Sequence, residues 1–367
     1  MGSDLLVSRM KVLFLYRHGI LGGVCTQLFH RLRHLDPNGG MEIHCGFRSD
    51  NGVESMLGKY ASLHFGLGES NTHKFVEEQD FDLIVIIDSE EYISSLRQME
   101  NRPPVIIEVH TSIERNLEYL GRLNEGDVDS FITVSEYMKG RIEFHRDESV
   151  NETQILIFDN VLDTDLFVNS GETDGGTPVL LWIGKIDDHK DWRAFMEICG
   201  NVCKKLPHVE YWIVGGQTCN QSLSQKVFEE ADKRGIIGRF RWLDRIENEK
   251  IPRLISLVAN RGGAKIVTSH GESFGMSILE ALLCRCPVIS SSVGAIPEIA
   301  RVGDGFQLYD LGDLDRATDL AVGFLRGDES ANRRGVFLDE ISNFLHNRYS
   351  SSIRSKDYWK ILQDIAN

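Results

Sequence analysis

Short apolar runs alternate with longer amphipathic stretches along the chain, and the first such unit is the clearest. Residues 11–16 form an apolar run of strand length, and residues 25–35 follow with the spacing of a helix. A glycine-containing loop, residues 18–24, joins them. An apolar strand, a glycine-containing loop and a helix in this order predict the start of a doubly wound α/β domain.

The same alternation recurs through the rest of the chain and is interrupted once. Residues 169–177 form a linker of glycine, serine, threonine and acidic residues, which is typical of a domain boundary. The runs on either side predict an α/β protein with two Rossmann-like, doubly wound domains, residues 1–168 and residues 169–349. Further strands are expected at 42–45, 83–87, 105–109 and 130–134 in the first domain, and at 179–183, 209–214, 240–243, 264–268 and 288–290 in the second.

Composition limits the class of protein without identifying it. The 367 residues include 40 Lys and Arg against 55 Asp and Glu, a formal net charge of −15. This balance argues against a nucleic-acid groove or strong attraction to anionic lipid, although it leaves room for a local cluster of cations. No apolar run approaches the roughly 18 residues of a membrane-spanning helix. The first ten residues lack the apolar core of a signal peptide, and peripheral membrane contact stays open.

Seven cysteines are scattered through the predicted core segments. Neither Cys199-x3-Cys203 nor Cys284-x-Cys286 has a second cysteine pair or a nearby histidine to complete a zinc site. Reduced thiols in a cytoplasmic protein are therefore the simpler interpretation.

Two acidic residues, Glu272 and Glu280, mark the most informative segment of the sequence, residues 269–299. In one continuous helix they would lie about 80° apart around the axis. The Phe274-Gly275 pair instead predicts a loop that carries Glu272, followed by a helix that carries Glu280 one turn from its start. Both acids would then lie near a helix N-terminus, which attracts anions and presents unpaired N–H groups.

This segment resembles the Glu-x7-Glu signature of retaining, nucleotide-sugar-dependent glycosyltransferases of family four, which have the GT-B fold. The resemblance implies two Rossmann-like domains that face an interdomain cleft, with the C-terminal helix, residues 350–367, crossing back onto the N-terminal domain. It extends beyond the two acids to Ser273-Phe-Gly, Glu280-Ala-Leu, Cys286-Pro-Val-Ile and Gly294-Ala-Ile-Pro-Glu-Ile.

The resemblance also implies roles in donor binding. Glu272 would bind the hydroxyl groups of the donor sugar, and Glu280 would bind the ribose. A local alternative exists for Glu280, because Ser277-x-x-Glu280 is also a helix capping box, and Glu272 could be an ordinary loop acid. The segment between the acids is expected to contribute donor contacts from Ser273, Phe274, Gly275, Met276 and Ser277.

A basic loop after the first strand of the second domain supplies two candidate cations. The family pattern here is Gly-Arg, followed five residues later by a lysine, and both basic groups bind the diphosphate. Lys185 and Lys190 occupy these two positions. Lys185, in place of arginine, keeps the positive charge but cannot form the bidentate hydrogen bonds that arginine makes to phosphate oxygens. A solvated basic loop without a ligand is the alternative.

Three residues of the first domain complete the expected site. Gly22 and Gly23 resemble the family's loop that faces the donor diphosphate, where glycine lets the backbone come close. A plain tight turn would explain them equally well. His110 follows the strand 105–109, where family members have a histidine near the sugar, although a lone histidine is more often structural.

No Asp-x-Asp motif is placed to bridge a metal ion and a diphosphate. Asp163-x-Asp165 lies close to the linker and is better explained as a turn. We therefore expect a metal-independent enzyme in which Lys185, Lys190 and helix N-termini stabilise the departing diphosphate. The catalytic residues expected from the resemblance are Glu272, His110, Lys185 and Lys190.

The expected function is transfer of a hexosyl unit, with retention of configuration, from a UDP- or GDP-linked sugar to an acceptor hydroxyl. The acceptor could be a sugar, a lipid-linked molecule or a small molecule, since surface loops of the N-terminal domain would bind it. The nucleotide sugar is a co-substrate, and no other cofactor is expected. Two alternatives stay open: a nucleotide-sugar epimerase of the same fold, and a catalytically silent subunit that binds a nucleotide sugar.

Overall fold

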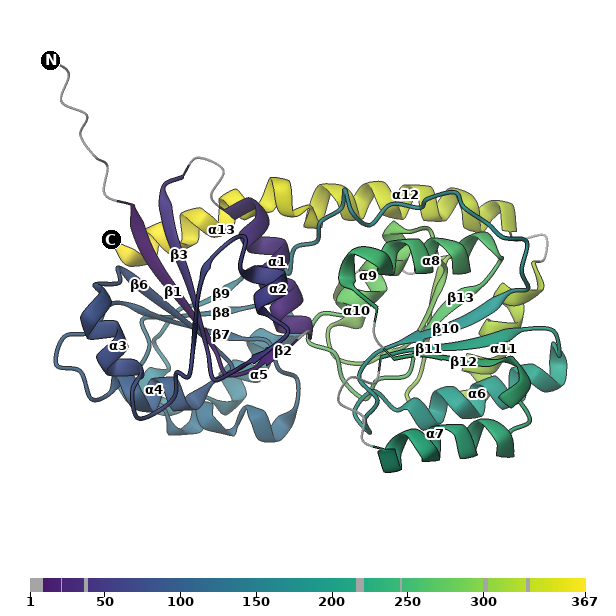
Figure 1. Cartoon of the computed structure of the whole chain (residues 1–367), viewed down its shortest axis with the longest axis horizontal. Coiled ribbons are helices and arrows are strands. Elements are labelled where there is room, and N and C mark those ends of the chain that lie inside the picture. The colour runs from purple at the N-terminus through teal and green to yellow at the C-terminus, as the bar shows by residue number, and fades with distance from the viewer. Residues whose placement is uncertain are drawn as a thin grey trace, which may run out of the picture. The chain divides into compact units, whose positions relative to one another are not determined.

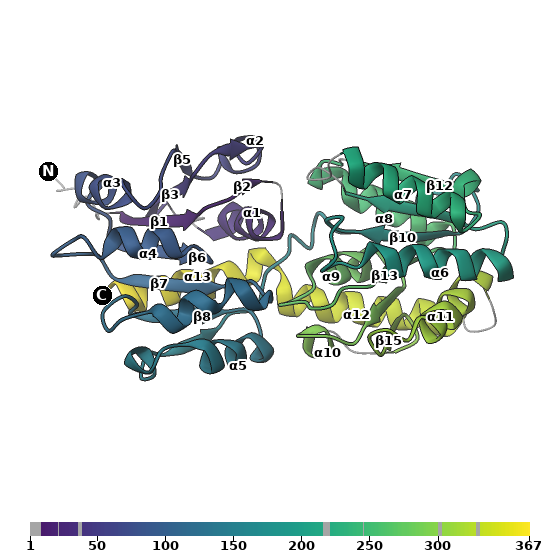
Figure 2. The ribbon, with the colours of Figure 1, turned by 90° about the horizontal axis from the view of Figure 1, so that it is seen from below.

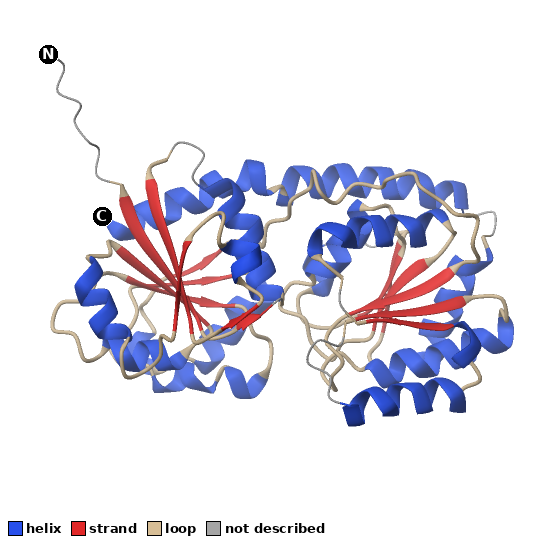
Figure 3. Cartoon of the chain, in the orientation of Figure 1, coloured by secondary structure: helices blue, strands red, loops and turns tan. Residues whose placement is uncertain are grey.

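The computed structural model describes residues 9–367 apart from 21, 36–38, 216–220, 245, 300–302 and 328–330. The chain divides into two compact units (Figure 1). One comprises the residues up to Leu162 together with Tyr349–Asn367, and the other comprises Asp163–Arg348. In each unit, helices cover both faces of a parallel sheet (Figure 3), as expected for doubly wound domains.

The sheet of the first unit is built on short apolar runs that are buried on both faces in its central strands. Its order is β5-β3-β1-β6-β7-β8-β9, so the direction of winding reverses between β1 and β6. The strands are β1 (Met10–Tyr16), β3 (Met41–Phe47), β5 (Ser62–Phe65), β6 (Leu83–Ile87), β7 (Val105–Val109), β8 (Ser130–Thr133) and β9 (Ile155–Ile157), with β2 (Gly19–Ile20) and β4 (Asp50–Asn51) as a separate pair.

Two helices from opposite ends of the sequence cover one face of this sheet, α1 (Gly23–Leu35) and α13 (Ser351–Ala366) (Figure 1). Tyr358 and Leu362 of α13 are fully buried in the same core as Phe14 of β1 and Leu28 of α1. The final helix of the chain is thus part of the N-terminal unit. The other helices of this unit are α2 (Glu54–Leu57), α3 (Thr72–Gln79), α4 (Glu90–Leu96) and α5 (Glu136–His145), and α3, α4 and α5 lie on the opposite face of the sheet (Figure 2).

The second unit contains six parallel strands in the order β12-β11-β10-β13-β14-β15, and its winding reverses between β10 and β13. Helices α6 and α11 share one core with the sheet. The strands are β10 (Val179–Ile183), β11 (Glu210–Val214), β12 (Phe240–Leu243), β13 (Ala264–Val267), β14 (Val288–Ser291) and β15 (Phe306–Tyr309). The helices are α6 (Trp192–Lys205), α7 (Gln221–Lys233), α8 (Ile251–Asn260), α9 (Met276–Leu283), α10 (Ile296–Ile299), α11 (Leu314–Arg326) and α12 (Ala331–Tyr349).

The boundary between the units lies at Leu162, whereas the linker composition placed it after residue 168. The difference arises because the hydroxyl of Ser256 in α8 donates to Val168 O at 3.4 Å and accepts from Ser170 N at 3.1 Å. These contacts attach the start of the linker to the second unit. Where the chain returns to the first unit, Leu162 N donates to Tyr349 O at 2.8 Å.

None of the helices in the described ranges is long and apolar enough to cross a membrane.

Candidate functional site

Two loops meet at the point of the second sheet where the winding reverses, one after β10 and one after β13. Ligands of doubly wound folds bind beyond the carboxyl ends of strands at such points. His270 N donates to His189 O at 2.8 Å, and Thr268 Oγ1 lies 2.8 Å from Lys190 O and 2.9 Å from Asp191 O. These bonds fix the basic loop against the start of the segment that carries Glu272.

Glu272 and Lys190, which are far apart in the sequence, form an ion pair at this point. Lys190 Nζ donates to Glu272 Oε1 at 2.7 Å, and Ser269 Oγ donates to the same oxygen at 2.7 Å. Burial raises the pKa of the Glu272 carboxyl, but the Lys190 charge and the hydrogen bonds from Lys190 and Ser269 outweigh it and leave the pKa below its usual range. Glu272 is therefore a carboxylate at neutral pH.

The backbone of Glu272 is fixed from a third loop, the one after β14. Ala295 N donates to Glu272 O at 2.9 Å. Gly294 has φ +55°, and a Cβ at this position would lie 2.2 Å from Glu272 O. Gly294 is thus required both for its positive φ and for its close contact with the Glu272 backbone. It thereby helps to fix the position of Glu272.

Lys185 is more exposed than Lys190 and has a different acidic neighbour. Its side chain is 60% exposed, compared with 28% for Lys190, and its Nζ lies 3.7 Å from Asp187 Oδ2. Asp187 also accepts from Lys190 N at 2.9 Å. The two lysines that the sequence grouped thus differ in exposure and partner, since Lys190 pairs with Glu272 and Lys185 lies near Asp187.

The helix that carries Glu280 begins differently from the capping-box alternative. The N-cap of α9 is Gly275, with φ +91°, and Ser277 lies inside the first turn. The capping-box interpretation is therefore wrong, since a glycine in the left-handed region starts the helix without a side-chain cap. The first-turn N–H groups of such a helix, at Met276 and Ser277, have no partner within the helix itself.

Glu280 lies one turn into α9 and interacts electrostatically with Lys265, a buried lysine of β13. Lys265 is fully buried and its Nζ donates to Ser277 O. Burial raises the pKa of Glu280 to about 7 against the opposing charge of Lys265. Burial likewise lowers the pKa of Lys265 to about 8. Lys265 was not among the predicted site residues, and its only signal in the sequence is a charged residue in the middle of an apolar run.

In the first unit, His110 stands at the carboxyl end of β7, beside the end of β6. Its backbone N–H lies 3.1 and 3.2 Å from the two carboxylate oxygens of Asp88, and its Nε2 lies 2.9 Å from Glu108 Oε2. Burial raises the pKa of Asp88 to about 6. His110 thus has two acidic neighbours that position both its backbone and its ring.

Gly22 and Gly23 lie at the start of α1, and neither has a positive φ. A Cβ added at Gly22 would meet only the Ile20 side chain, at 3.7 Å, and one added at Gly23 would meet nothing within 4 Å. Neither turn geometry nor packing within the described part of this unit requires glycine at these positions.

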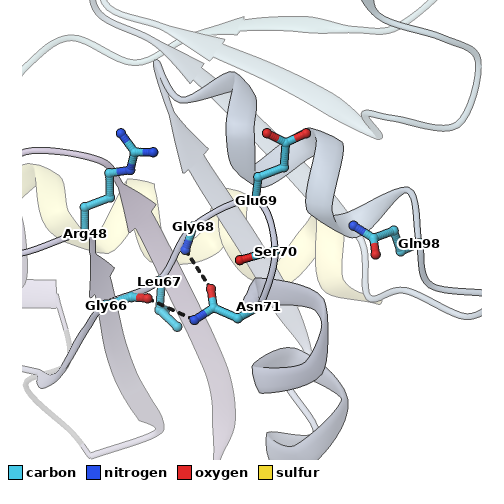
Figure 4. A pocket seen from close by; sticks show the side chains of 8 residues that line it. All are labelled: Arg48, Gly66, Leu67, Gly68, Glu69, Ser70, Asn71 and Gln98. Carbon is cyan, nitrogen blue, oxygen red and sulfur yellow. Dashed lines mark hydrogen bonds between the residues drawn. The ribbon is translucent and has the colours of Figure 1, made fainter.

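Beyond β3 and β5 the first unit has a polar groove of about 850 Å³, which the sequence analysis did not find (Figure 4). The Asn71 amide shapes its wall by accepting from Gly68 N and donating to Gly66 O, both at 2.9 Å. A smaller hollow of about 390 Å³ continues past Arg48 and Glu69 to Glu90 and Glu91, close to the end of β6. The groove is lined by Arg48, Gly66, Leu67, Gly68, Glu69, Ser70, Asn71 and Gln98.

The described residues contain no group of three or more His, Cys, Asp or Glu side chains arranged to hold a metal ion.

Comparison with known proteins gives the class of the second unit. Residues 163–333 match the family "Glycosyl transferases group 1", and this domain of the chain belongs to that family. The chain is 23% identical over 156 residues to 2-deoxystreptamine N-acetyl-D-glucosaminyltransferase of Niallia circulans, a match that covers 42% of the chain and 38% of that enzyme. The chain thus spans less than half of that relative's length.

Two further similarities cover most of the chain. It is 22% identical over 328 residues to phosphatidyl-myo-inositol mannosyltransferase of Mycolicibacterium smegmatis, which covers 84% of the chain and 78% of that protein. The crystal structure of Anabaena HepE in complex with UDP-glucose superposes with a TM-score of 0.81 at 16% identity, covering 97% of the chain and 100% of HepE. The GT-B fold predicted from the sequence is confirmed.

Proposed function

We propose that this chain is a retaining glycosyltransferase that moves a hexosyl unit from a UDP- or GDP-linked sugar to an acceptor hydroxyl. The observation that carries the proposal is the Lys190–Glu272 pair at the point where the second sheet reverses its winding. A nucleotide sugar presents hydroxyl groups and a diphosphate a few bonds apart. The Glu272 carboxylate can accept hydrogen bonds from the hydroxyl groups, and Lys190, whose Nζ lies 2.7 Å from Glu272 Oε1, can bind the diphosphate.

In this proposal Glu272 accepts hydrogen bonds from the sugar hydroxyls, and Lys190 binds the diphosphate as the bond from the anomeric carbon to oxygen breaks. Lys185 adds charge from the edge of the loop, and the N–H groups of Met276 and Ser277 at the start of α9 face the same ligand. Ser273, Phe274 and Gly275, in the loop before the helix, add further donor contacts. Such preorganised donors are effective where negative charge develops. No side chain is assigned as nucleophile, and the leaving phosphate takes the proton of the acceptor on the same face.

Glu280 binds the ribose in this proposal, and His110, Gly22 and Gly23 serve the donor from the first unit. Among the described residues nothing in the packing requires glycine at 22 and 23, which supports close approach of a ligand there. Transfer without a metal ion is also proposed, because Lys185, Lys190 and the start of α9 supply positive charge for the diphosphate. The six described cysteines are free thiols, which supports a cytoplasmic location.

The acceptor is proposed to bind in the polar groove of the first unit, at the carboxyl edge of its sheet. Arg48, Glu69 and Asn71 offer hydrogen-bonding groups, and Leu67 is the apolar residue among those that line it. Such a lining suits a hydroxyl-rich acceptor or the polar part of a lipid-linked one.

A thermal-shift screen of UDP, GDP and their hexose derivatives tests the proposal, because a ligand that binds the native state raises its melting temperature. We expect either the UDP series or the GDP series to raise the melting temperature of the wild type. In Glu272→Gln, the nucleotide sugar of that series should no longer raise it. Nucleotide release that depends on an added acceptor distinguishes transfer from epimerisation. Binding without turnover, across a panel of acceptors, would instead identify a silent subunit.

A further inference from the structure

A buried carboxylate, Glu108 of β7, connects His110 to the final helix of the chain. Glu108 is 0% exposed and accepts three sets of hydrogen bonds. Arg31 Nη1 of α1 lies 2.9 and 2.8 Å from its two oxygens, the Tyr358 hydroxyl of α13 donates to Oε1, and His110 Nε2 lies 2.9 Å from Oε2. Every donor comes from a different part of the sequence.

The partners of Glu108 are themselves fixed by packing. The Arg31 guanidinium lies 4.4 Å from the ring centre of Tyr358 and 5.3 Å from that of Phe158. The Tyr358 ring in turn lies 5.0 Å from Phe158 and 6.5 Å from Phe14. A fully buried cation that lies over two aromatic rings packed against each other has little freedom to move, so Arg31 and Tyr358 fix the orientation of the Glu108 carboxylate.

The hydrogen bond between Glu108 and His110 defines which ring nitrogen carries the proton. Burial raises the pKa of Glu108, but the Arg31 charge and the bonds from His110 and Tyr358 outweigh it and bring the pKa to about 2. A carboxylate only accepts hydrogen bonds, so Nε2 must carry a hydrogen. In the neutral ring, Nδ1 is then an acceptor. Among the described residues Nδ1 makes no hydrogen bond.

We propose that Glu108 is a positioning residue that holds His110 as the Nε2–H tautomer, with Nδ1 turned to accept a hydrogen bond from a ligand hydroxyl, and that Tyr358 of the C-terminal helix holds Glu108 in place for this task. The inference rests on the proposed function, which assigns His110 to the donor sugar. It adds two residues, Glu108 and Tyr358, whose effect on transfer is exerted through the histidine ring.

The tautomer can be measured without any substrate, by ¹⁵N NMR of the histidine rings in the whole protein. The spectrum of His110→Asn identifies the His110 signals by their loss. In the wild type we expect a protonated Nε2 and an unprotonated Nδ1. In Glu108→Gln, whose amide can donate as well as accept, we expect a mixture of both tautomers. A wild-type ring protonated on Nδ1, or an unchanged tautomer in Glu108→Gln, overturns the inference.

Glu108→Gln leaves the Arg31 charge buried without a counter-charge and is the variant more prone to misfold. Tyr358→Phe is the second variant, because it keeps the packing and the charge pair and removes one hydrogen bond. Its matched control is Tyr211→Phe, which alters a fully buried tyrosine of β11 in the other unit. Melting temperatures of both variants report any structural cost.

Activity is followed as UDP release from UDP-glucose, or GDP release from GDP-mannose, whichever the wild type turns over. We expect Glu108→Gln to lower kcat by about tenfold or more, the size expected of a charged hydrogen bond, with the donor KM nearly unchanged. Tyr358→Phe should lower kcat by less, and Tyr211→Phe should leave it unchanged. Equal kcat values for the two tyrosine variants would remove Tyr358 from the positioning role.

The NMR and kinetic results separate the failure of this inference from that of the proposed function. If His110→Asn leaves turnover intact while the wild-type tautomer is as expected, the assignment of His110 to the donor site fails, and the positioning role fails with it, while transfer itself stands. If the tautomer is not held but His110→Asn abolishes turnover, only the role of Glu108 and Tyr358 is lost.

Discussion

Replacing Glu272 with glutamine should separate the binding of the sugar from the binding of the nucleotide. Glutamine keeps the shape of the side chain but removes the charge, so Lys190 Nζ, now 2.7 Å from the carboxylate, loses its partner. Lys190 is then fully available to a diphosphate. We expect UDP or GDP alone to bind this variant at least as tightly as the wild type, whereas the corresponding nucleotide sugar binds more weakly.

The size of the loss follows from the kind of bond that is removed. A hydrogen bond to a charged group contributes about 1.5–3 kcal/mol, which corresponds to a decrease in nucleotide-sugar affinity of about tenfold to about 150-fold. Lys190→Ala should behave differently, because it removes the cation that serves both ligands and should weaken both by a similar factor. It also leaves Glu272, whose side chain is 14% exposed, without its ion pair, so the free energy of unfolding should fall by about 1.5–3 kcal/mol.

Isothermal titration calorimetry with UDP and UDP-glucose, and with GDP and GDP-mannose, measures both affinities for each variant. Asp188→Asn is the matched control, because Asp188 is a 90% exposed carboxylate on the same loop and should leave both affinities unchanged. The reasoning is refuted if Glu272→Gln weakens the free nucleotide as much as the nucleotide sugar, or if Lys190→Ala binds free nucleotide normally.

Three other predictions concern the same unit. Lys185→Ala should weaken UDP or GDP binding less than Lys190→Ala, since Lys185 lies at the exposed edge of the loop, and Lys185→Arg should be tolerated; an equal or greater loss in a calorimetric titration would contradict this. Transfer should persist in EDTA, and a complete loss that manganese or magnesium restores would show a required metal. The pKa of Glu280 is raised from 4.5 to about 7, so wild-type stability should fall as pH rises through this range, because the folded protein keeps a proton that the unfolded chain has released. Glu280→Gln should lack this decline in urea unfolding and should bind UDP or GDP about tenfold more weakly, whereas normal binding would leave Glu280 without a ribose role.

The central strands were predictable because burial on both faces leaves a plain signal. Residues 83–87 are apolar throughout and form β6 as expected. Two of the strands that were not predicted, β5 and β15, lie at sheet edges. Their sequences, Ser-Leu-His-Phe and Phe-Gln-Leu-Tyr, mix polar and apolar residues because both strands are partly exposed, so neither carries a continuous apolar run.

The candidate site was predictable as a set of residues but not as a set of contacts. The spacing of Glu272 and Glu280 identified the segment, yet the local Ser277-x-x-Glu280 pattern suggested a cap where Gly275 starts the helix instead. The bond from Lys190 to Glu272 joins residues from two separate strand ends. Such pairings depend on strand order, which single-sequence patterns do not contain.

The buried network in the first unit was missed for the same reason. His110 was identified by its place after a strand, but its neighbour Glu108 was not assigned a role. Its partners Arg31 and Tyr358 lie 77 and 250 positions away in the sequence. A buried charge within a strand is the one local clue, since such a group is seldom found without a partner.

The position of α13 has a consequence for the order in which the protein is assembled during synthesis. Residues up to Leu162 leave the ribosome before the second unit, yet their core includes Tyr358 and Leu362. Until α13 is made, Phe14 and Phe158 lack their contact with the Tyr358 ring, and Glu108 lacks the hydrogen bond from the Tyr358 hydroxyl. Domains generally fold in the order of their synthesis. Here the second unit can fold as one continuous stretch while the first still waits for its final helix, so a fragment that ends at Leu162 should expose apolar surface and aggregate, and one in which α13 is joined directly after Leu162 should not.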